Sequence, residues 1–462
     1  MTTTNGAAPR AATVRGRPLV GVLPELVRDG PELCARAMRA HPRSVVRLPV
    51  GPASIYVVHH PDHVQHVMVE NNRNYWKGRA FNRASFLFGR GLVMNEGESW
   101  LHQRRLMSPG FSHARVAGLV PIMADVVRRK GDAWEAAMRA GQPVEMVHEM
   151  MTITLEIIAR TMFSSGVTDG DVRRMADAFG PILRHIGLRF GTFWLPERIP
   201  LPGTAKANTA VAVLEEVVRR VVAERRASGE RPDDLLSMLL DARDAESGAP
   251  MSDRQLRDEV LTTLFGGYEA TADSLAWTWH LLARHPDAAA RMREEVDAVM
   301  AGDAPTVEEL GRMDYTRRVI MESMRLYPPF WWNLRAARED DVVGGTRIPA
   351  GATVLLVTYA THRHPEFWDD PDRFDPDRFL PEAVAGRHRH AYVPFGTGQR
   401  ACVGRHLAML ETPLVLAMLA RRFRAVPVPG RPVVYRAEAS LRARHGVWMT
   451  LETGGVRECV SA

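Results

Sequence analysis

The stretch that decides the fold is FGTGQRACVG at residues 395–404, in which Cys402 lies within a glycine-rich loop. A helical pattern begins at about Gly404, so the thiol lies near the positive end of a helix dipole, where a thiolate is stabilised. Arg400 lies two residues before the cysteine and can pair with an anionic group, while Phe395 can shield one side of the sulfur. The glycines let the backbone approach a flat, bulky group closely. Together these features indicate a planar, carboxylated metal cofactor, which points to haem held by cysteine.

The same ten residues resemble the haem-binding signature of the cytochrome P450 superfamily, F-x-x-G-x-R-x-C-x-G. Every fixed position of the signature is met, by Phe395, Gly398, Arg400, Cys402 and Gly404. The resemblance implies that Cys402 is the axial ligand of the iron in haem b and that the other four residues form the cofactor-binding loop. For the loop alone, the alternative is a buried cysteine in an ordinary turn, and the further motifs described below argue against it.

The amino-acid composition excludes several classes of protein. The chain has 462 residues, of which 45% are hydrophobic and 25% charged, which is ordinary for a globular protein. Its formal charge of +6 is spread without a basic stripe interleaved with aromatics, so no nucleic-acid partner is expected. Cys34, Cys402 and Cys459 lack zinc-type or paired spacing, which fits a reducing, cytoplasmic location. No apolar run approaches the roughly 20 residues that span a bilayer, so no membrane anchor is expected.

The start of the chain predicts a small β portion. Residues 1–15 are polar and are expected to be disordered. A helical pattern over residues 24–41 is followed by β-like runs at residues 44–50 and 54–59, separated by a Gly-Pro turn. Pro61 then begins another helical pattern, and such a helix–strand–strand–helix opening resembles that of a cytochrome P450.

Two irregular regions predict a ligand cavity and its cover. Residues 75–95 form an aromatic, apolar stretch that either packs on the core or lines a cavity. Residues 171–225 alternate helical pattern with breakers, including Gly180-Pro181, and are interpreted as a hinged lid rather than an ordinary proline-rich connection. The predicted substrate contacts are Phe86, Leu92, Phe193, Leu264, Phe330, Trp331 and Asn333.

The longest predicted helix begins at Ser252, which forms a capping-box pattern with Gln255, and ends before His285-Pro286. At ~1.5 Å per residue such a helix is roughly 50 Å long and could cross a whole domain. Because it is apolar on several faces, it is expected to be buried.

The middle of this helix departs from a family motif. Gly266 and Gly267 would leave a groove for a ligand, with helix packing as the alternative, and a charge at Glu269 is costly on a buried helix unless it has a function. These three residues resemble the oxygen-binding kink of cytochromes P450, A/G-G-x-E/D-T. The next position holds Ala270 in place of threonine, and the alcohol appears one residue later at Thr271. One residue is ~100° around a helix, so the proton relay differs from the family pattern.

Donors to the haem propionates are expected at four positions. Trp100 and Arg104 lie four residues apart on a predicted helix and resemble the family's W-x-x-x-R element. Arg335 matches the arginine that reaches a propionate in the family, and Arg400 belongs to the cysteine loop.

A second helix carries Glu322 and Arg325, which lie three residues apart and resemble the family's E-x-x-R motif. Arg378 follows in a segment that resembles the P-E-R-F element, with aspartate in place of glutamate. The resemblance assigns these three residues to folding around the haem rather than to chemistry.

The resemblance covers essentially the whole chain. It implies a mainly α protein with a small β portion, a single cytochrome P450 domain over residues 1–462, and a long central helix over the haem. The implied function is a soluble bacterial monooxygenase that hydroxylates or epoxidises a lipophilic polyketide, macrolactam or terpenoid of secondary metabolism. It would use O₂ and electrons from a separate ferredoxin and ferredoxin reductase, and we expect a monomer. The alternatives are a haem-thiolate enzyme catalysing desaturation, ring coupling or rearrangement, and a non-catalytic haem sensor.

Overall fold

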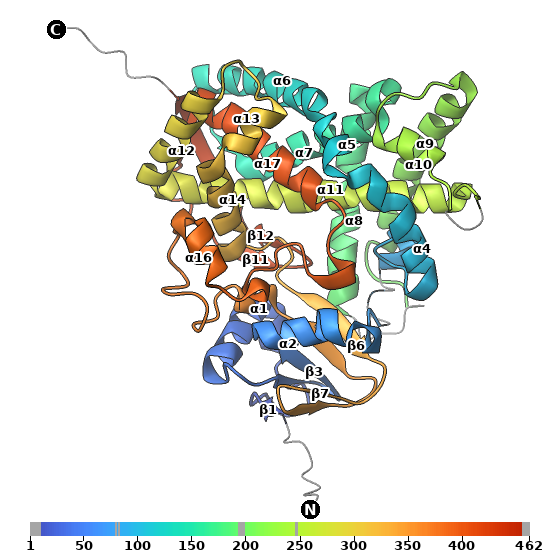
Figure 1. Ribbon diagram of the computed structural model, residues 1–462, viewed down its shortest axis with the longest axis vertical. Helices are drawn as coiled ribbons and strands as arrows, with labels where there is room; N and C mark the ends of the chain where they lie inside the picture. The colour runs from blue at the N-terminus through green and yellow to red at the C-terminus, as the bar shows by residue number, and fades with distance from the viewer. Residues whose placement is uncertain (1–10, 79–80, 82–83, 193–198, 245–247, 455–462) are drawn as a thin grey trace, which may run out of the picture. The chain divides into compact units, whose positions relative to one another are not determined.

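The computed structural model describes residues 11–78, 81, 84–192, 199–244 and 248–454. They form two compact units, each assembled from stretches distant in sequence (Figure 1). The strand-rich unit comprises Met1–Asn82, Met324–Cys402 and Arg436–Arg442, and the helical unit comprises Arg83–Ser323, Val403–Tyr435 and Ala443–Ala462. That the whole chain is one domain stays a prediction.

A six-stranded sheet is the core of the strand-rich unit, with the order β1-β2-β3-β9-β6-β4. Its strands are β1 (Ala12–Thr13), β2 (Val46–Val50), β3 (Ala53–Val58), β4 (Tyr75–Trp76), β6 (Asn333–Ala337) and β9 (Thr353–Leu356). The predicted hairpin is β2 and β3, whose turn uses Gly51 at a φ of +57°. The parallel pairing of β3 with β9 joins chain segments about 300 residues apart, as Ile55 lies opposite Thr353. Val58, Val354 and Leu356 pack into one hydrophobic cluster there.

The remaining elements of this unit are short, apart from one helix. They are α1 (Leu23–Ala40), α2 (Pro61–Gln65), η1 (His66–Glu70), η2 (Asn72–Asn74), β7 (Asp341–Val343), β8 (Thr346–Ile348), α15 (Thr358–Thr361), η6 (Pro376–Phe379), α16 (Pro381–Ala385), η7 (Arg389–Ala391) and η8 (Gly398–Arg400). Three of the boundaries between the units fall inside a helix or strand, namely α14 (Asp314–Leu326), β11 (Tyr435–Ala437) and β12 (Leu441–Ala443).

The helical unit contains most of the long helices together with several short ones. They are α3 (Ser85–Phe88), α4 (Gly97–Met107), η4 (Ser108–Phe111), α5 (His113–Ala117), α6 (Val120–Arg139), α7 (Met146–Phe163), η5 (Ser164–Gly166), α8 (Asp169–Gly191), α9 (Thr204–Ser228), α10 (Leu235–Asp241), α11 (Asp253–Arg284), α12 (Pro286–Val299), α13 (Val307–Arg312) and α17 (Arg405–Arg422). A three-stranded sheet of β10 (Phe423–Pro427), β13 (Trp448–Thr453) and β5 (Val144–Glu145) completes it.

The long helix α11 has the predicted bounds. The Ser252 hydroxyl accepts the N–H of Gln255 at 3.2 Å, as expected for an N-cap. Most of α11 is buried. It runs through the helical unit beside α7 and α17, both of which it contacts (Figure 1). A Cβ on Gly267 would lie 2.8 Å from Ile158 Cδ1, so this glycine is required for close packing against α7. Gly267 thus packs against α7, and a ligand groove at Gly266 and Gly267 stays a prediction.

Two local predictions were wrong. We expected Gly180-Pro181 to break the chain, but α8 continues through it, with neighbouring Phe179 and Ile182 almost fully buried. Burial of these side chains offsets the cost of a proline inside a helix. Disorder was expected through residue 15, but Ala12 and Thr13 pair with β2.

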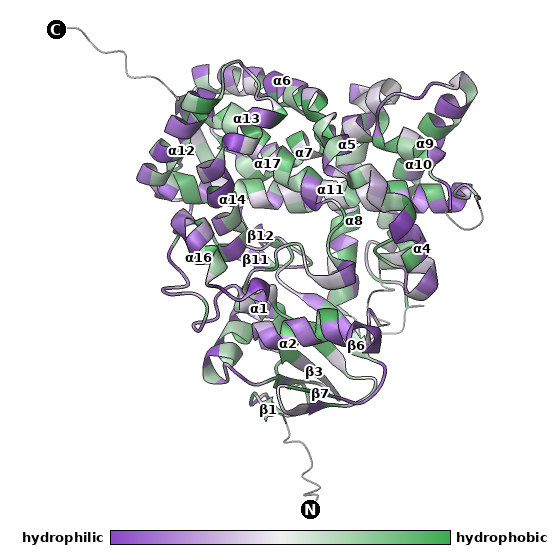
Figure 2. Ribbon diagram, viewed as in Figure 1, coloured by the Kyte–Doolittle hydropathy of each residue, from purple (hydrophilic) through white to green (hydrophobic). Residues whose placement is uncertain are grey.

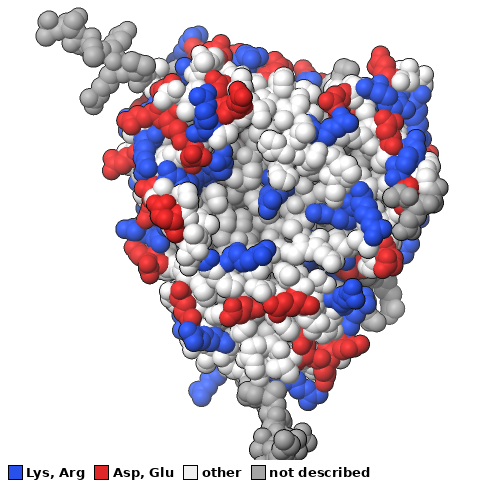
Figure 3. Space-filling model, viewed as in Figure 1, with Lys and Arg blue, Asp and Glu red and all other residues white. Residues whose placement is uncertain are grey.

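Polar and charged groups are distributed over the surface. Figure 2 shows α12 as alternating polar and apolar residues, typical of a helix with one packed face. In Figure 3 both acidic and basic side chains occur around the edges of the visible face, and much of its centre is uncharged. Across the described residues, every helix is too short or too polar to be a candidate membrane span.

Candidate active site

The cysteine loop belongs to the strand-rich unit up to Cys402. The Cys402 N–H donates to the carbonyl of Phe395 over 2.8 Å, which closes the loop, and Gly396 and Gly398 both adopt positive φ. The Cys402 side chain is exposed, whereas burial raises the pKa of the Cys34 thiol to about 12. Of the two described cysteines, only Cys402 therefore offers an accessible sulfur. Gly404 follows as the N-cap residue of α17.

Gly398 also has a packing role that the signature did not reveal. A Cβ at this position would lie 2.2 Å from the Met68 carbonyl oxygen, so the loop backbone rests directly on η1. Its φ of +69° is unfavourable for other residues as well. The loop is therefore shaped by its own unit, and its contact with a cofactor stays a prediction.

The E-x-x-R arginine is fully buried in the strand-rich unit. Arg325 donates to the main-chain carbonyls of His362 (3.0 Å), Pro371 (2.6 Å) and Arg373 (3.1 Å). It thus fixes the segment that precedes the cysteine loop, and its role in folding around the haem stays a prediction. Glu322 is equally buried on the same helix, α14. Arg378 donates to the Asp370 carbonyl, in the same connecting segment, over 2.8 Å.

The predicted contacts around β6 differ in exposure. Phe330 is 43% exposed, whereas the Trp331 ring is buried against Gly30 of α1 and its N–H donates to the Glu438 carbonyl over 3.1 Å. The Arg335 guanidinium contacts Asn333 Oδ1 and donates to the Leu334 carbonyl over 2.7 Å. Arg335 is 4% exposed and Arg400 is half-buried in η8.

In the helical unit, α4 carries Trp100, which is 6% exposed, and the half-buried Arg104. Their spacing places both on one face of the helix, as predicted.

The accessible face of α11 carries Ala270 and not Thr271. Gly266 is exposed and a Cβ there would meet nothing within 4 Å, and Ala270, one turn later, is partly exposed. Thr271 is 5% exposed and Glu269 3% exposed. Since Gly266 and Ala270 share a helix face, the alanine occupies the open side where the family motif has its alcohol.

The other predicted substrate contacts in this unit are placed in different surroundings. Phe86 on α3 packs edge-on against His185 of α8, with ring centroids 5.2 Å apart. Leu92 is 7% exposed and Leu264 is fully buried. Phe193 lies outside the described residues.

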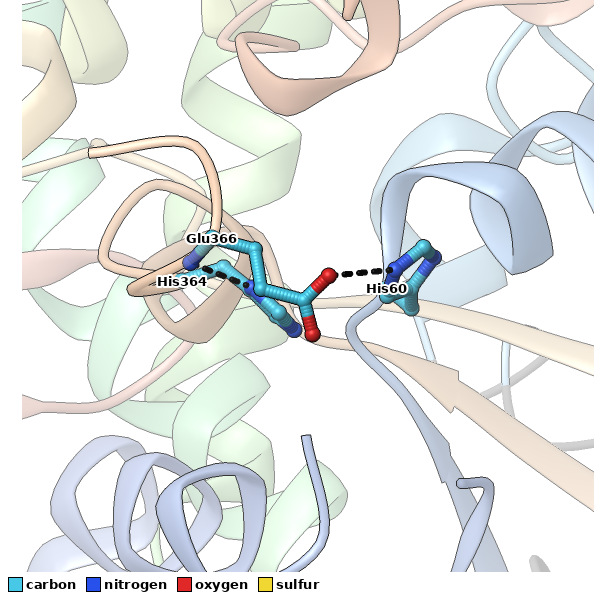
Figure 4. A group of neighbouring side chains, drawn as sticks. All are labelled: His60, His364 and Glu366. Carbon is cyan, nitrogen blue, oxygen red and sulfur yellow. Dashed lines mark hydrogen bonds and ion pairs between the residues drawn. The ribbon is translucent and has the colours of Figure 1, made fainter. Parts of the chain in front are cut away.

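Three side chains of the strand-rich unit combine residue types that bind metals. The ligand atoms of His60, His364 and Glu366 lie within 4.8 Å of one another (Figure 4). Hydrogen bonds already use most of these atoms, because His364 Nε2 lies 2.8 Å from the Pro42 carbonyl and its Nδ1 accepts the Glu366 N–H. Both Glu366 oxygens accept from Arg43 over 2.9 Å. We interpret the group as a hydrogen-bonded structural cluster.

Sequence reasoning missed two groups of residues. One is His362, which connects Arg325 to the chain before the cysteine loop. The other is the pair Asp258 and Glu259, whose only signal was two adjacent acids in a helix expected to be buried.

Comparison with known proteins agrees with the fold and motifs. The family model for cytochrome P450 matches residues 12–445. The chain is 35% identical over 428 residues to "Cyclooctat-9-en-7-ol 5-monooxygenase" of Streptomyces melanosporofaciens, covering 92% of this chain and 91% of the relative. It is 34% identical to "Pentalenene oxygenase" of Streptomyces avermitilis, covering 93% of each.

A solved structure, "Crystal structure of cytochrome P450DA heme domain", superposes with a TM-score of 0.89 at 27% identity, covering 97% of this chain and 98% of that one. The predicted P450 fold, mainly α with small sheets, is thereby confirmed. The chain therefore belongs to the cytochrome P450 family and is a monooxygenase with a haem-iron cofactor, which acts on a small molecule with O₂ and electrons from redox partners.

Proposed function

We propose that this monooxygenase hydroxylates or epoxidises a terpenoid in bacterial secondary metabolism. The observation that carries the proposal is its likeness, along nine-tenths of its length, to enzymes named for cyclooctat-9-en-7-ol and pentalenene. Of the three substrate classes considered from the sequence, polyketide, macrolactam and terpenoid, these names favour the last.

The test is incubation with pentalenene and related polycyclic terpene alkenes, in the presence of NADPH, a ferredoxin and a ferredoxin reductase. The expected result is a product heavier than its substrate by one oxygen atom, which is labelled from ¹⁸O₂. Oxygenation of fatty acids or macrolactams together with inert terpenes would contradict the proposed substrate class.

Cys402 is the proposed axial ligand. Haem bound through a thiolate supplies the activation of O₂. The residues present fit this cofactor, since an exposed cysteine precedes a long helix and cationic or N–H donors occur at the four predicted positions. Arg335 and Arg400, with Trp100 and Arg104, are proposed to bind the propionates, because guanidinium and indole N–H groups are suited to carboxylates.

Proton delivery is proposed to bypass the side chain at residue 270. The methyl group of Ala270 cannot donate a proton, and Thr271 lies buried on a different face of α11. General acid transfer needs a donor at roughly 2.6–3.2 Å or one bridging water. We therefore favour an ordered water or a hydroxyl on the substrate as the donor, with Glu269 as the acid nearby in sequence.

The alanine also supports a second candidate function. A haem-thiolate enzyme without the usual alcohol could catalyse desaturation, ring coupling or rearrangement on the same class of substrate. A product that lacks the ¹⁸O label, or that loses two hydrogens, would favour this candidate over oxygen insertion.

Separate ferredoxin and ferredoxin reductase proteins are the proposed electron donors, acting in the cytoplasm on a monomeric enzyme. Arg400 and the exposed Arg405 lie on either side of Cys402 in the sequence and offer positive charge to an acidic partner.

A further inference from the structure

Two consecutive acids of α11 bind the main chain of the segment after α3. The N–H of Arg90 donates to Asp258 Oδ2 over 2.8 Å, and the N–H of Leu92 donates to Glu259 Oε2 over 3.0 Å. Asp258 is 2% exposed and Glu259 is fully buried. Buried carboxylates are costly unless they are hydrogen-bonded, so these contacts offset part of the cost of two adjacent acids inside the helix.

Two glycines bring the segment into direct contact with α11. A Cβ on Gly89 would lie 2.3 Å from the Asp258 carboxylate oxygens, and a Cβ on Gly91 would lie 2.2 Å from Thr262 Oγ1. Gly89 also adopts a φ of +51°. Only glycine fits at either position, so the backbone and the carboxylates are matched in shape as well as in hydrogen bonding.

Arg257 extends the contact to a third element. It donates to the Leu87 carbonyl over 3.0 Å and to Asp258 Oδ1 over 2.6 Å, and it pairs with Glu215 of α9. Three successive residues of α11 therefore hold both the segment of residues 87–92 and a neighbouring helix.

Two aromatic side chains of α3, Phe86 and Phe88, lie just before residues 89–92 in the sequence. Phe88 packs edge-on against Phe265, with ring centroids 4.9 Å apart, and Phe265 directly precedes the open position Gly266. Phe86 packs against His185 of α8. Since Phe88 directly precedes residues 89–92, movement of these residues would move the ring that packs on Phe265, the neighbour of Gly266 in the sequence.

We propose that Asp258 and Glu259 are positioning residues that fix the segment of residues 89–92 on α11 and thereby limit the size of the substrate. This rests on the proposed function, in which the accessible face of α11 meets the substrate. Weakening either carboxylate should let the segment move away and admit bulkier molecules, without changing the haem ligand.

The variants are Asp258→Asn, Glu259→Gln and Glu259→Ala, with Gly91→Ala as an independent steric wedge. The control is Asp253→Asn, which removes an exposed acid of the same helix that pairs only at the surface, with Arg226. Glutamine keeps an acceptor oxygen for Leu92, so Glu259→Gln should have a smaller effect than Glu259→Ala.

Two azoles that bind haem iron serve as probes, the small phenylimidazole and the bulky clotrimazole, each titrated by its spectral shift. In Asp258→Asn, Glu259→Ala and Gly91→Ala clotrimazole should bind at least about fivefold tighter, and in Glu259→Gln the gain should be smaller. The affinity for phenylimidazole in every variant, and for either azole in the Asp253→Asn control, should change by less than about twofold. Equal changes for both azoles, or no change for either, would overturn the size limit.

Hydrogen exchange separates this proposal from the assignment of the haem site. The amides of Arg90 and Leu92 should be protected in the parent and should exchange at least about tenfold faster in Glu259→Ala. Rapid exchange in the parent would overturn the anchoring by itself. Azoles that fail to shift the parent spectrum would instead contradict the haem site, and the exchange result would still decide whether the carboxylates hold the segment.

Discussion

Arg325 donates a hydrogen bond from Nη1 to the main-chain carbonyl of His362 over 3.0 Å, and both side chains are completely buried. The His362 ring then accepts the N–H of Val393 at Nε2 over 2.9 Å, and the Val393 carbonyl accepts the N–H of Gly396. A continuous series of hydrogen bonds therefore connects the E-x-x-R arginine to the loop that ends at Cys402.

Replacing Arg325 should break this series. In Arg325→Lys a single ammonium cannot reach the three carbonyls that the guanidinium serves, so we expect a loss of at least about 3 kcal/mol in unfolding free energy. The measurements are urea unfolding and haem content. Arg373→Lys, an exposed arginine in the same segment, is the control, and equal behaviour of the two variants would contradict the role of Arg325.

Acid should destabilise the strand-rich unit through buried histidines. Burial, together with neighbouring histidines, lowers the pKa of His59 to about 3. Between that value and the unfolded pKa near 6.5, only the unfolded chain binds the proton, so stability falls by up to about 1.4 kcal/mol per pH unit as pH drops.

His59→Leu should flatten this dependence between about pH 6.5 and 4. Neither ring nitrogen of His59 has a hydrogen-bond partner among the described residues, so stability at neutral pH should not fall. The exposed His148, changed to leucine, provides the control. A parent-like acid slope in His59→Leu would show that this histidine is not responsible.

The buried Glu411 of α17 should change the pH dependence of stability in the direction opposite to His59, because it favours the folded protein at acid pH. Burial raises the pKa of its carboxyl well above the ordinary value, so the folded protein retains a proton that the unfolded chain releases as pH rises. Its stabilising contribution is therefore present below the unfolded pKa of about 4.3 and is lost progressively as pH rises from there through the raised pKa of the folded protein. Glu411→Gln should raise the unfolding free energy at pH 8 by at least about 1 kcal/mol, whereas the exposed Glu382→Gln should not. Destabilisation of the glutamine variant at pH 8 would refute this interpretation.

The amount of product formed per NADPH consumed should depend on the side chain at residue 270 and not on the side chain at residue 271. Ala270→Thr places a hydroxyl on the accessible face of α11, so product formed per NADPH should rise for substrates without a polar group. Thr271→Val changes a buried side chain and should leave the ratio within about twofold of the parent. A collapse in Thr271→Val would put the relay on Thr271.

Local signals predicted the long elements well. Ser252 and His285-Pro286 fixed the ends of α11, and the Gly51-Pro52 turn placed the β2–β3 hairpin. The family motifs placed Cys402, Arg325 and Trp100 on the expected types of element, because those motifs are local in sequence.

Contacts that depend on distant residues could not be predicted. Asp258 meets Arg90 across 168 positions, and no pattern within either stretch marks the pairing. Pro181 was misread because local breaker signals do not include the burial of its neighbours in α8. The same limit applies to Gly267, whose requirement becomes visible only beside Ile158 of α7.

The carbon-monoxide difference spectrum of the reduced protein shows whether Cys402 binds the haem iron. The parent and Cys34→Ser should both show the red-shifted band of thiolate-bound haem, and Cys402→Ala should lose it. Retention of that band in Cys402→Ala, or its loss in Cys34→Ser alone, would show that Cys402 is not the iron ligand.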